Sequence, residues 1–385
     1  MAHNNTVFSQ LLKLVPRHEF ETLAKQHHYG QSLRKTSRWS QFVSLCLGQL
    51  SGRQSLRDIE SNMKAQSQRL YHLGAKPIAK SSLSRLNEQQ PAELYEALFA
   101  KLYARCQQQT QGHRFRFKNK LYSLDASLID LSLKIFPWAH YALGKAAMKL
   151  HLSLDHSGYI PHFACITKGK VSDIEIGRTL HYSKGSIVVF DKGYTDYKWF
   201  KALTDKGIFF VTRVRKNALW RVEERRPANK AKGLTSDQTI TLTGIKPQKL
   251  GVPKLRRIGY RDPETGQRYE FLTNNFALSA QTIAEIYKER WQVELFFKWI
   301  KQNLKIKSFI GNSKNAIMTQ IWVSLCTYLI LAYLKFSAKL SGSLQTLFRL
   351  LQLNLFLRRD LISLLKGLPP PADEFKNRQL VLVLV

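Results

Sequence analysis

The sequence predicts an α/β domain built on a mixed sheet, with an all-helical region before it and more helices after it. Three observations lead to this fold class. Residues 1–113 carry apolar side chains at helical spacing, as in Phe8, Leu11, Leu12 and Val15. From residue 121 onward, apolar and polar residues alternate as in strands, and strand-like segments then alternate with helix-like ones. Residues 316–366 are rich in leucine and are followed by three consecutive prolines.

The helical region contains a candidate for DNA contact. One helix is expected to begin after Ser55, because this N-cap serine has an acidic residue three places on. A short connection leads to a second helix at 81–87. This pair fits a helix-turn-helix with Ser82, Arg85 and Asn87 on its exposed face, or an ordinary helical hairpin. We therefore assign 1–113 as a helical N-terminal DNA-binding domain.

The sheet domain is expected to span 114–312. Its predicted strands are 121–129, 148–155, 160–167, 186–190 and 208–213, and its predicted helices are 173–182, 197–206 and 280–304. Residues 215–275 interrupt this order with short Gly-, Pro- and Thr-rich strands, which predict a β-rich insertion. Residues 313–385 form a helical C-terminal region, and the alternating tail 380–385 could add a strand.

Charge is the strongest compositional signal. Sixty Lys and Arg against 27 Asp and Glu leave a net charge of +33, and the sequence pI is about 10.1. Such an excess is typical of proteins that neutralise phosphates, although a ribosomal-type or membrane-surface protein would also show it. Charge alone does not distinguish DNA from RNA.

The cysteines and the apolar stretches indicate a cytoplasmic protein. Cys46, Cys106, Cys165 and Cys326 form no C-x-x-C pair, so we expect buried free thiols in a reducing cytosol and no structural zinc. The first residues are polar and lack the apolar core of a signal peptide. The uncharged stretch 316–334 is expected to be a buried core helix rather than a membrane span.

Two aspartates are candidates for an active site. Asp125 lies inside a predicted strand, and Asp191 follows the apolar run 187–190 directly. Sites in open α/β sheets form at the carboxyl ends of strands, where Asp191 is expected to lie. Each aspartate taken alone is also compatible with a turn or cap role.

The predicted helix 280–304 carries the most informative pattern. Tyr287, Arg290, Glu294 and Lys301 are separated by three, four and seven residues, and so share a stripe roughly 60° wide at about 100° per residue. A second, apolar stripe can pack on the sheet and consists of Val293, Phe296, Ile300 and Leu304. One carboxylate between a phenol and two cations suits a metal-bound phosphate, although a solvated ion-pair face has the same pattern.

The pattern Y-x2-R-x3-E-x6-K resembles the signature of the insertion-sequence-four type of bacterial DDE transposases, and every position fits. The sequence around Asp125-Ala-Ser, the Asp191-Lys-Gly-Tyr segment, residues 271–275, the region 287–304 and the N-terminal Ser55-Leu-Arg-Asp also resemble this family. The resemblance spans about residues 5–366. Lys192 is a small departure, since many relatives carry Arg there.

This resemblance implies a ribonuclease-H-like catalytic core whose β-rich insertion lies between the last core strand and the helix that bears the glutamate. Asp125, Asp191 and Glu294 would be the DDE triad and would hold two Mg²⁺ or Mn²⁺ ions, which suit hard oxygen ligands. Tyr287, Arg290 and Lys301 would contact DNA. The implied function is cut-and-paste transposition through a hairpin intermediate.

The implied partners are the element's terminal inverted repeats and target DNA, bound by a homodimer in the bacterial nucleoid. Family members place a tryptophan in the insertion to receive a base that leaves the stack, and Trp220 is the tryptophan within 215–275. Tyr260 or Tyr269 could serve instead, and Trp220 could equally pack in the insertion's own core. The alternatives for the whole chain are a related nuclease without strand transfer and a decayed transposase that only binds DNA as a repressor.

Overall fold

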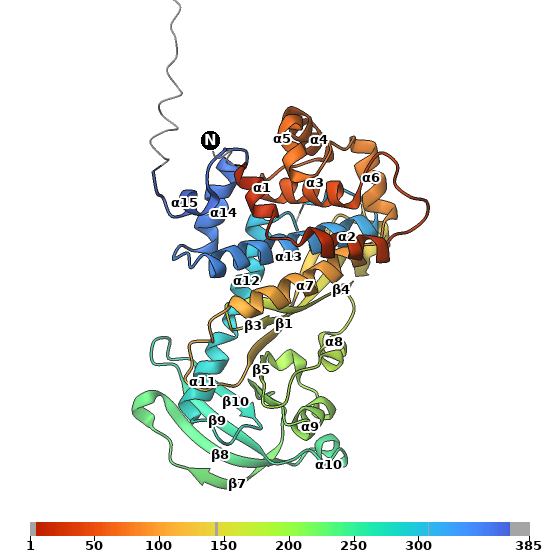
Figure 1. Cartoon of the computed structure of the whole chain (residues 1–385). Coiled ribbons are helices and arrows are strands. Elements are labelled where there is room, and N and C mark those ends of the chain that lie inside the picture. The colour runs from red at the N-terminus through yellow and green to blue at the C-terminus, as the bar shows by residue number, and fades with distance from the viewer. Residues whose placement is uncertain (1–4, 143–144, 307, 370–385) are drawn as a thin grey trace, which may run out of the picture. The chain divides into compact units, whose positions relative to one another are not determined.

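The computed structural model describes residues 5–142, 145–306 and 308–369 (Figure 1). The chain divides into two compact units. A helical unit takes in Met1–Thr110 and Ile300–Val385, and a sheet unit takes in Gln111–Trp299. The predicted tail strand 380–385 lies outside the described residues.

The helical unit is organised around one long apolar helix, α13 (Lys314–Ser337). This helix packs against α3, α6, α7 and α14, and 89% of its most apolar window is buried. In the described part of the chain it alone is long and apolar enough to cross a membrane. Its burial is that of a core helix. Helices from the first 110 residues cover α13. The N-terminal and C-terminal helices therefore form one unit.

The other elements of this unit are mostly short helices. They are α1 (Val7–Leu12), α2 (Arg17–Gln26), α3 (Arg38–Leu50), α4 (Leu56–Ala65), α5 (Ser67–Leu70), η1 (Tyr71–Leu73), α6 (Lys80–Gln89), α7 (Glu93–Gln109), α14 (Leu344–Asn354) and α15 (Leu361–Leu365).

The candidate helix-turn-helix region contains both predicted helices but differs on its exposed face. Ser55 caps α4 through the expected capping box with Asp58. On α6, Arg85 is exposed and Ser82 is half-buried. The expectation for Asn87 was wrong, because its side chain is only 2% exposed and its Oδ1 accepts a hydrogen bond from Gln41 Nε2 at 2.8 Å. Asn87 follows Leu86 on the buried face of α6 and therefore faces the core.

The cysteines are mostly buried, and none of the four forms a disulfide. Burial raises the pKa of the Cys46 and Cys106 thiols to about 12. Cys326 is also buried, whereas Cys165 is half-buried rather than buried as expected.

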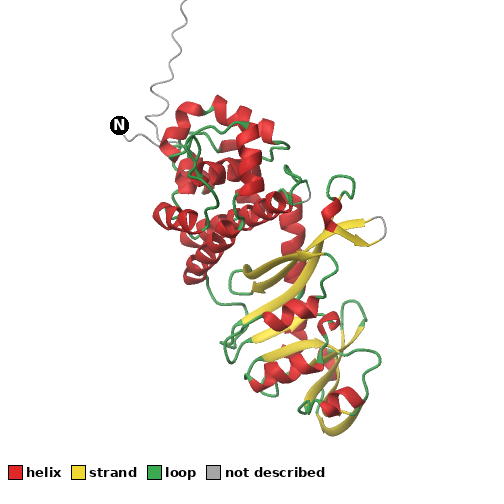
Figure 2. Cartoon of the chain, turned by 90° about the vertical axis from the view of Figure 1, so that its right-hand side faces the viewer, coloured by secondary structure: helices red, strands yellow, loops and turns green. Residues whose placement is uncertain are grey.

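The sheet unit contains one large mixed sheet (Figure 2). Its strand order is β2-β3-β1-β5-β6-β10-β9-β8-β7, with β4 paired to β3. The first strands are β1 (Leu121–Leu131), β2 (His140–Ala142), β3 (Lys145–Asp155), β4 (Ile160–Lys168), β5 (Ile187–Phe190) and β6 (Phe209–Arg213). Strands β1, β5 and β6 are parallel neighbours, while β3 pairs antiparallel with both β1 and β4.

The predicted insertion continues this same sheet. Its strands are β7 (Trp220–Arg226), β8 (Leu234–Leu242), β9 (Leu255–Arg261) and β10 (Arg268–Thr273), with η4 (Lys230–Lys232) and α10 (Ile245–Lys249) between them. All four are antiparallel to their neighbours, and β10 pairs with β6.

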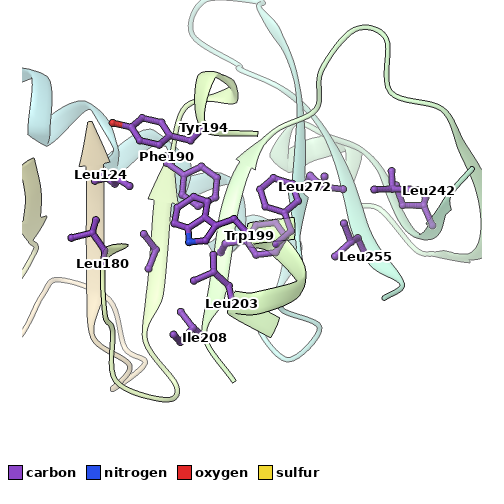
Figure 3. Close-up of a cluster of buried hydrophobic side chains, with 14 residues drawn as sticks. Leu124, Leu180, Phe190, Tyr194, Trp199, Leu203, Ile208, Leu242, Leu255 and Leu272 are labelled. Atoms are coloured by element: carbon purple, nitrogen blue, oxygen red, sulfur yellow. The ribbon is translucent and has the colours of Figure 1, made fainter. Parts of the chain in front are cut away.

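Helices cover both faces of the sheet because the central strands are apolar on both sides. Val188 and Phe190 of β5 pack on one face with α9 (Tyr197–Asp205), in the cluster that Figure 3 shows around Phe190 and Trp199. Ile187 and Val189 pack on the other face with α11 (Ala280–Glu289). Two further short elements follow β4 and β5, namely α8 (Asp173–Thr179) and η3 (Lys192–Tyr194).

The predicted helix 280–304 is broken at Arg290. The structure has α11 and then α12 (Trp291–Asn303). At the break the backbone tightens to i→i−3 bonds, from Arg290 N to Tyr287 O at 3.1 Å and from Val293 N to Arg290 O at 3.2 Å. The expectation of one continuous helix was therefore wrong. The break could not be foreseen, because no Gly or Pro marks the position in the sequence.

A buried ion pair ties the insertion to the start of α11. Arg256 on β9 and Asp237 on β8 form two hydrogen bonds of 2.8 and 2.7 Å, with both side chains about 5% exposed. The third nitrogen of Arg256, Nη1, donates to the Leu278 carbonyl at 2.6 Å, just before α11 begins.

We predict that Asp237→Ala lowers the free energy of unfolding by about 3–5 kcal/mol, because it leaves a buried guanidinium without its carboxylate. Denaturant unfolding measures the change. Asp205→Ala is the matched control, since its pair with Lys201 is exposed and contributes about 1 kcal/mol or less. Equal losses in the two variants would contradict the prediction.

Candidate active site

Strand register brings three charged side chains level on adjacent strands, at the point where β5 and β6 end and β1 continues. Leu124 pairs with Phe190, which puts Asp125 of β1 beside Asp191. Val189 pairs with Val211, which puts Asp191 beside Arg213 of β6. Because side chains alternate along a strand, Asp125 and Asp191 share the face that α11 covers.

The Asp125 carboxyl is largely buried. Burial, together with the negative charges of Glu294 and Asp173, raises its pKa to about 6. The backbone N–H of Ala126 donates to its Oδ1 at 2.9 Å, and Arg290 Nη1 lies 3.5 Å from its Oδ2. Both contacts act in the opposite direction, toward the ionised form.

The Asp191 carboxylate is held by groups from two other elements. Arg213 donates to its Oδ1 at 2.8 Å, and the Tyr287 hydroxyl donates to the same oxygen at 3.3 Å. Burial raises the pKa of Asp191, but the bonds from Arg213 and the Lys192 backbone outweigh it, so the net shift is downward. Asp191 therefore stays ionised at neutral pH.

Arg290 connects the helix break to the sheet. Its guanidinium donates to Glu294 Oε1 one turn later on α12 and also reaches Asp125. The structure thus joins Asp125 and Glu294 through one cation, with Asp191 next to Asp125 in the sheet. Arg290 is mostly buried, with its side chain 13% exposed, so these contacts are weakly screened by water.

Asp125, Asp191 and Glu294 are of the residue type that binds divalent metal ions, although their side chains do not surround a common point in this structure. In the described ranges, no group of three or more His, Cys, Asp and Glu side chains is positioned to hold a metal ion. The donor set is nevertheless made of hard carboxylate oxygens, which Mg²⁺ and Mn²⁺ prefer. The Arg290 guanidinium shows that a positive charge is accommodated between Asp125 and Glu294.

The remaining residues of the predicted stripe have different surroundings. Tyr287 is buried, and its ring lies 5.8 Å from the guanidinium carbons of both Arg213 and Arg290. Lys301 lies on α12, seven residues after Glu294, in the part of that helix that belongs to the helical unit. The apolar stripe of Val293, Phe296, Ile300 and Leu304 is buried as expected.

The three aromatic candidates of the insertion are all partly covered. Trp220 begins β7, packs against the cluster around Phe190, and has the Arg257 guanidinium 4.8 Å from its ring. Tyr260 and Tyr269 pack beside Phe271, at ring distances of 6.2 and 5.9 Å.

Sequence reasoning missed Arg213 and Asp173. Arg213 closes an apolar strand as Asp191 does, and that parallel position was the available signal. Asp173, the first residue of α8, lies close enough to Asp125 to influence its pKa and is held by Lys149 Nζ at 2.9 Å. Nothing in the local sequence marks Asp173 as a neighbour of Asp125.

Two segments of the chain match known protein families. Residues 116–330 match the family described as Transposase DDE domain, and residues 3–76 match a domain of unknown function, DUF4372. The first match covers more than half of the chain and contains Asp125, Asp191 and Glu294.

Known proteins with similar sequences are transposases. The chain is 33% identical over 312 residues to the putative transposase y4zB of Sinorhizobium fredii, which covers 79% of this chain and 83% of that protein. It is 27% identical over 257 residues to the probable transposase for insertion sequence element IS5377 of Geobacillus stearothermophilus. That similarity covers 66% of this chain and 67% of that protein. A likeness to the structure of the piggyBac transposase synaptic complex with hairpin DNA has a TM-score of 0.45 and 11% identity, over 97% of this chain and 81% of that one. From the family match and these relatives, the chain belongs to the DDE transposases.

Proposed function

We propose that this transposase cuts the ends of an insertion sequence and joins them to target DNA through Asp125, Asp191 and Glu294. The observation that carries the proposal is the level placement of Asp125 and Asp191 on adjacent parallel strands, with Arg290 joining Asp125 to Glu294. The core would be ribonuclease-H-like, an assignment supported by three antiparallel strands (β4, β3, β1) followed by the parallel β5 and β6.

The three carboxylates would hold two divalent ions, Mg²⁺ or Mn²⁺. When bound, such ions supply positive charge to the phosphate and activate a water or a 3′-hydroxyl. Asp125 is largely buried, and in such a low-dielectric environment its charge interactions with the ions and the scissile phosphate would be stronger than in water. Arg213 and Tyr287 keep the Asp191 carboxylate in one orientation.

The arginine of the stripe has a separate task. Arg290 is always charged and presents a planar set of N–H donors, which suits a phosphate as well as it suits the carboxylates it now contacts. On DNA binding it would donate to the phosphate beside the cut, and Lys301 would add a second cation further along α12.

The wider cycle follows the same chemistry. The N-terminal helices, with Arg85 exposed on α6, would bind the terminal inverted repeats. Two copies would act on the paired ends, and a hairpin intermediate would require a base to leave the stack near Trp220. The protein would work in the bacterial cytoplasm at the nucleoid. All three acids of the triad are present, whereas a decayed transposase that acts only as a repressor predicts a damaged triad.

We predict that Asp125→Ala, Asp191→Ala and Glu294→Ala each abolish nicking of a labelled end in Mg²⁺ while binding to that end remains. The reason is that the metal ions need all three carboxylates. Asp205→Ala, a change of an exposed acid, should cut normally. Nicking within about tenfold of wild type in a triad variant would remove that residue from the metal ligands.

A second prediction concerns the cations. Arg290→Ala and Lys301→Ala should slow cleavage and weaken binding of cleaved ends more than of random duplex, by roughly 1.5–3 kcal/mol for each lost charge-assisted phosphate contact. Competition binding at fixed salt measures the difference. Normal cutting by both variants would mean that Arg290 and Lys301 do not contact the phosphates, and that Arg290 serves only its ion pairs within the protein.

A third prediction separates two roles of Trp220. If its ring receives the displaced base, Trp220→Ala permits the first nick and blocks hairpin formation, and an abasic site at the displaced position restores part of the yield. The lost stacking is worth about 1–3 kcal/mol. Gel analysis of nicked and hairpin products gives the yields. Unchanged hairpin yield, or a loss of folding in thermal melting, would assign Trp220 to packing with Arg257.

A further inference from the structure

A buried polar cluster lies on the sheet face below the candidate active site. It joins Ser123 of β1, His156 in the turn after β3, and Glu289, the last residue of α11. Their exposed fractions are 0, 2 and 5%. Ionisable groups this deeply buried cost folding free energy unless they are paired, so the contacts of this cluster need a role.

The three residues form a series in which His156 lies between Ser123 and Glu289. Ser123 Oγ and His156 Nε2 lie 2.6 Å apart, and His156 Nδ1 lies 3.7 Å from Glu289 Oε2. A carboxylate repels a ring lone pair, so the proton belongs on Nδ1. Nε2 then accepts the hydrogen of the Ser123 hydroxyl. Burial lowers the pKa of His156, so the ring is neutral at pH 7 and carries a single N–H.

Two further groups fix the glutamate. Arg114 lies 2.7 Å from Glu289 Oε1, and the Tyr159 hydroxyl donates to Oε2 at 3.1 Å. Tyr159 reaches it from a left-handed backbone conformation, with φ 53°, which is strained for a residue that carries a side chain. The turn after β3 therefore bears strain while it contacts the end of α11.

A Ser–His–Glu series is also the arrangement of a hydrolase nucleophile, but that role does not fit here. Ser123 exposes no surface, so no substrate carbonyl or phosphate can reach its hydroxyl. The cluster must act through its neighbours. Ser123 is two residues before Asp125 on the same strand face, and Glu289 directly precedes Arg290 at the helix break.

We propose that Ser123, His156 and Glu289 are positioning residues that form a buried strut between β1 and the α11–α12 junction, and that this strut sets Arg290 and Glu294 against Asp125. One end of the strut is anchored in the strand that carries Asp125, and the other is the last residue of α11, next to the break at Arg290. The strut meets the helices at the point where their backbone bonds change to i→i−3 spacing. This inference rests on the proposed function, since it assigns the strut to the cleavage geometry.

The test compares Ser123→Ala, His156→Ala and Glu289→Gln in the full chain. Each is expected to slow single-turnover cleavage of a labelled end about ten- to a hundredfold, with end binding within about twofold of wild type, because small displacements of catalytic groups cost rates of this size. Hydrogen exchange at the backbone amides of residues 290–294 should also become faster in each variant. The double variant Ser123→Ala with Glu289→Gln should be no slower than the worse single variant, since both break one strut.

Thr273→Val is the matched control for lost stability. Thr273 is fully buried on β10, and its hydroxyl donates to the Phe210 carbonyl away from the junction. It should lower the melting temperature but leave cleavage and exchange at 290–294 unchanged. The proposal is overturned if Glu289→Gln cuts at the wild-type rate, if the single effects multiply in the double variant, or if Thr273→Val slows cleavage equally. Asp125→Asn run in parallel separates the two claims, since cleavage that survives this change overturns the proposed function instead.

Discussion

The parallel pairing of β1 with β5 is the constraint on which the site depends. With Leu124 opposite Phe190, Asp125 and Asp191 reach the same level on the same face, and a shift of one residue would turn one of the two side chains to the opposite face. The register is fixed by apolar residues on both faces, Val188 and Phe190 toward α9 and Ile187 and Val189 toward α11. Two independent cores therefore determine where the two carboxylates lie.

The third carboxylate depends on the helix break rather than on the sheet. Glu294 lies on α12, after the helix break at Arg290, and the guanidinium of Arg290 connects it to Asp125. Arg213, on the neighbouring strand, forms an ion pair with Asp191. Each acid thus has an arginine partner that balances its charge. Divalent ions and DNA phosphates would have to redistribute these contacts, and Arg290 can exchange a carboxylate for a phosphate without changing its own charge.

Much of this arrangement can be predicted from sequence, because it depends on local patterns. The apolar run before Asp191, the alternation around Asp125 and the capping box at Ser55 each specify an element within a few residues. Long-range packing could not be predicted in this way. Asn87 is polar at a position that suggests exposure, yet Gln41 from another helix pairs with it in the core. The association of α13 with the N-terminal helices is likewise set by contacts between residues more than 200 apart.

The features that sequence reasoning missed are those in which a polar residue faces a partner distant in the chain. Arg213, Ser123 and Glu289 look like ordinary strand and helix residues until the fold brings Asp191, His156 and Arg114 to them. The helix break at Arg290 has no Gly or Pro to announce it. Polar contacts of this kind are specified by tertiary structure rather than by local sequence, and Arg213 and Arg290 make them directly with Asp191, Asp125 and Glu294.

We propose that Asp125, Asp191 and Glu294 place divalent ions on the phosphate that is cut. The most direct measurement is single-turnover cleavage of an end whose scissile phosphate carries one sulfur in place of a non-bridging oxygen, in Mg²⁺ and in Mn²⁺. Sulfur is a poor ligand for the hard Mg²⁺ and a better one for Mn²⁺. If the three acids hold the ions in this way, cleavage in Mg²⁺ is strongly reduced for one of the two sulfur stereoisomers and is restored in Mn²⁺. An equal effect of sulfur with both ions, for both stereoisomers, would contradict it.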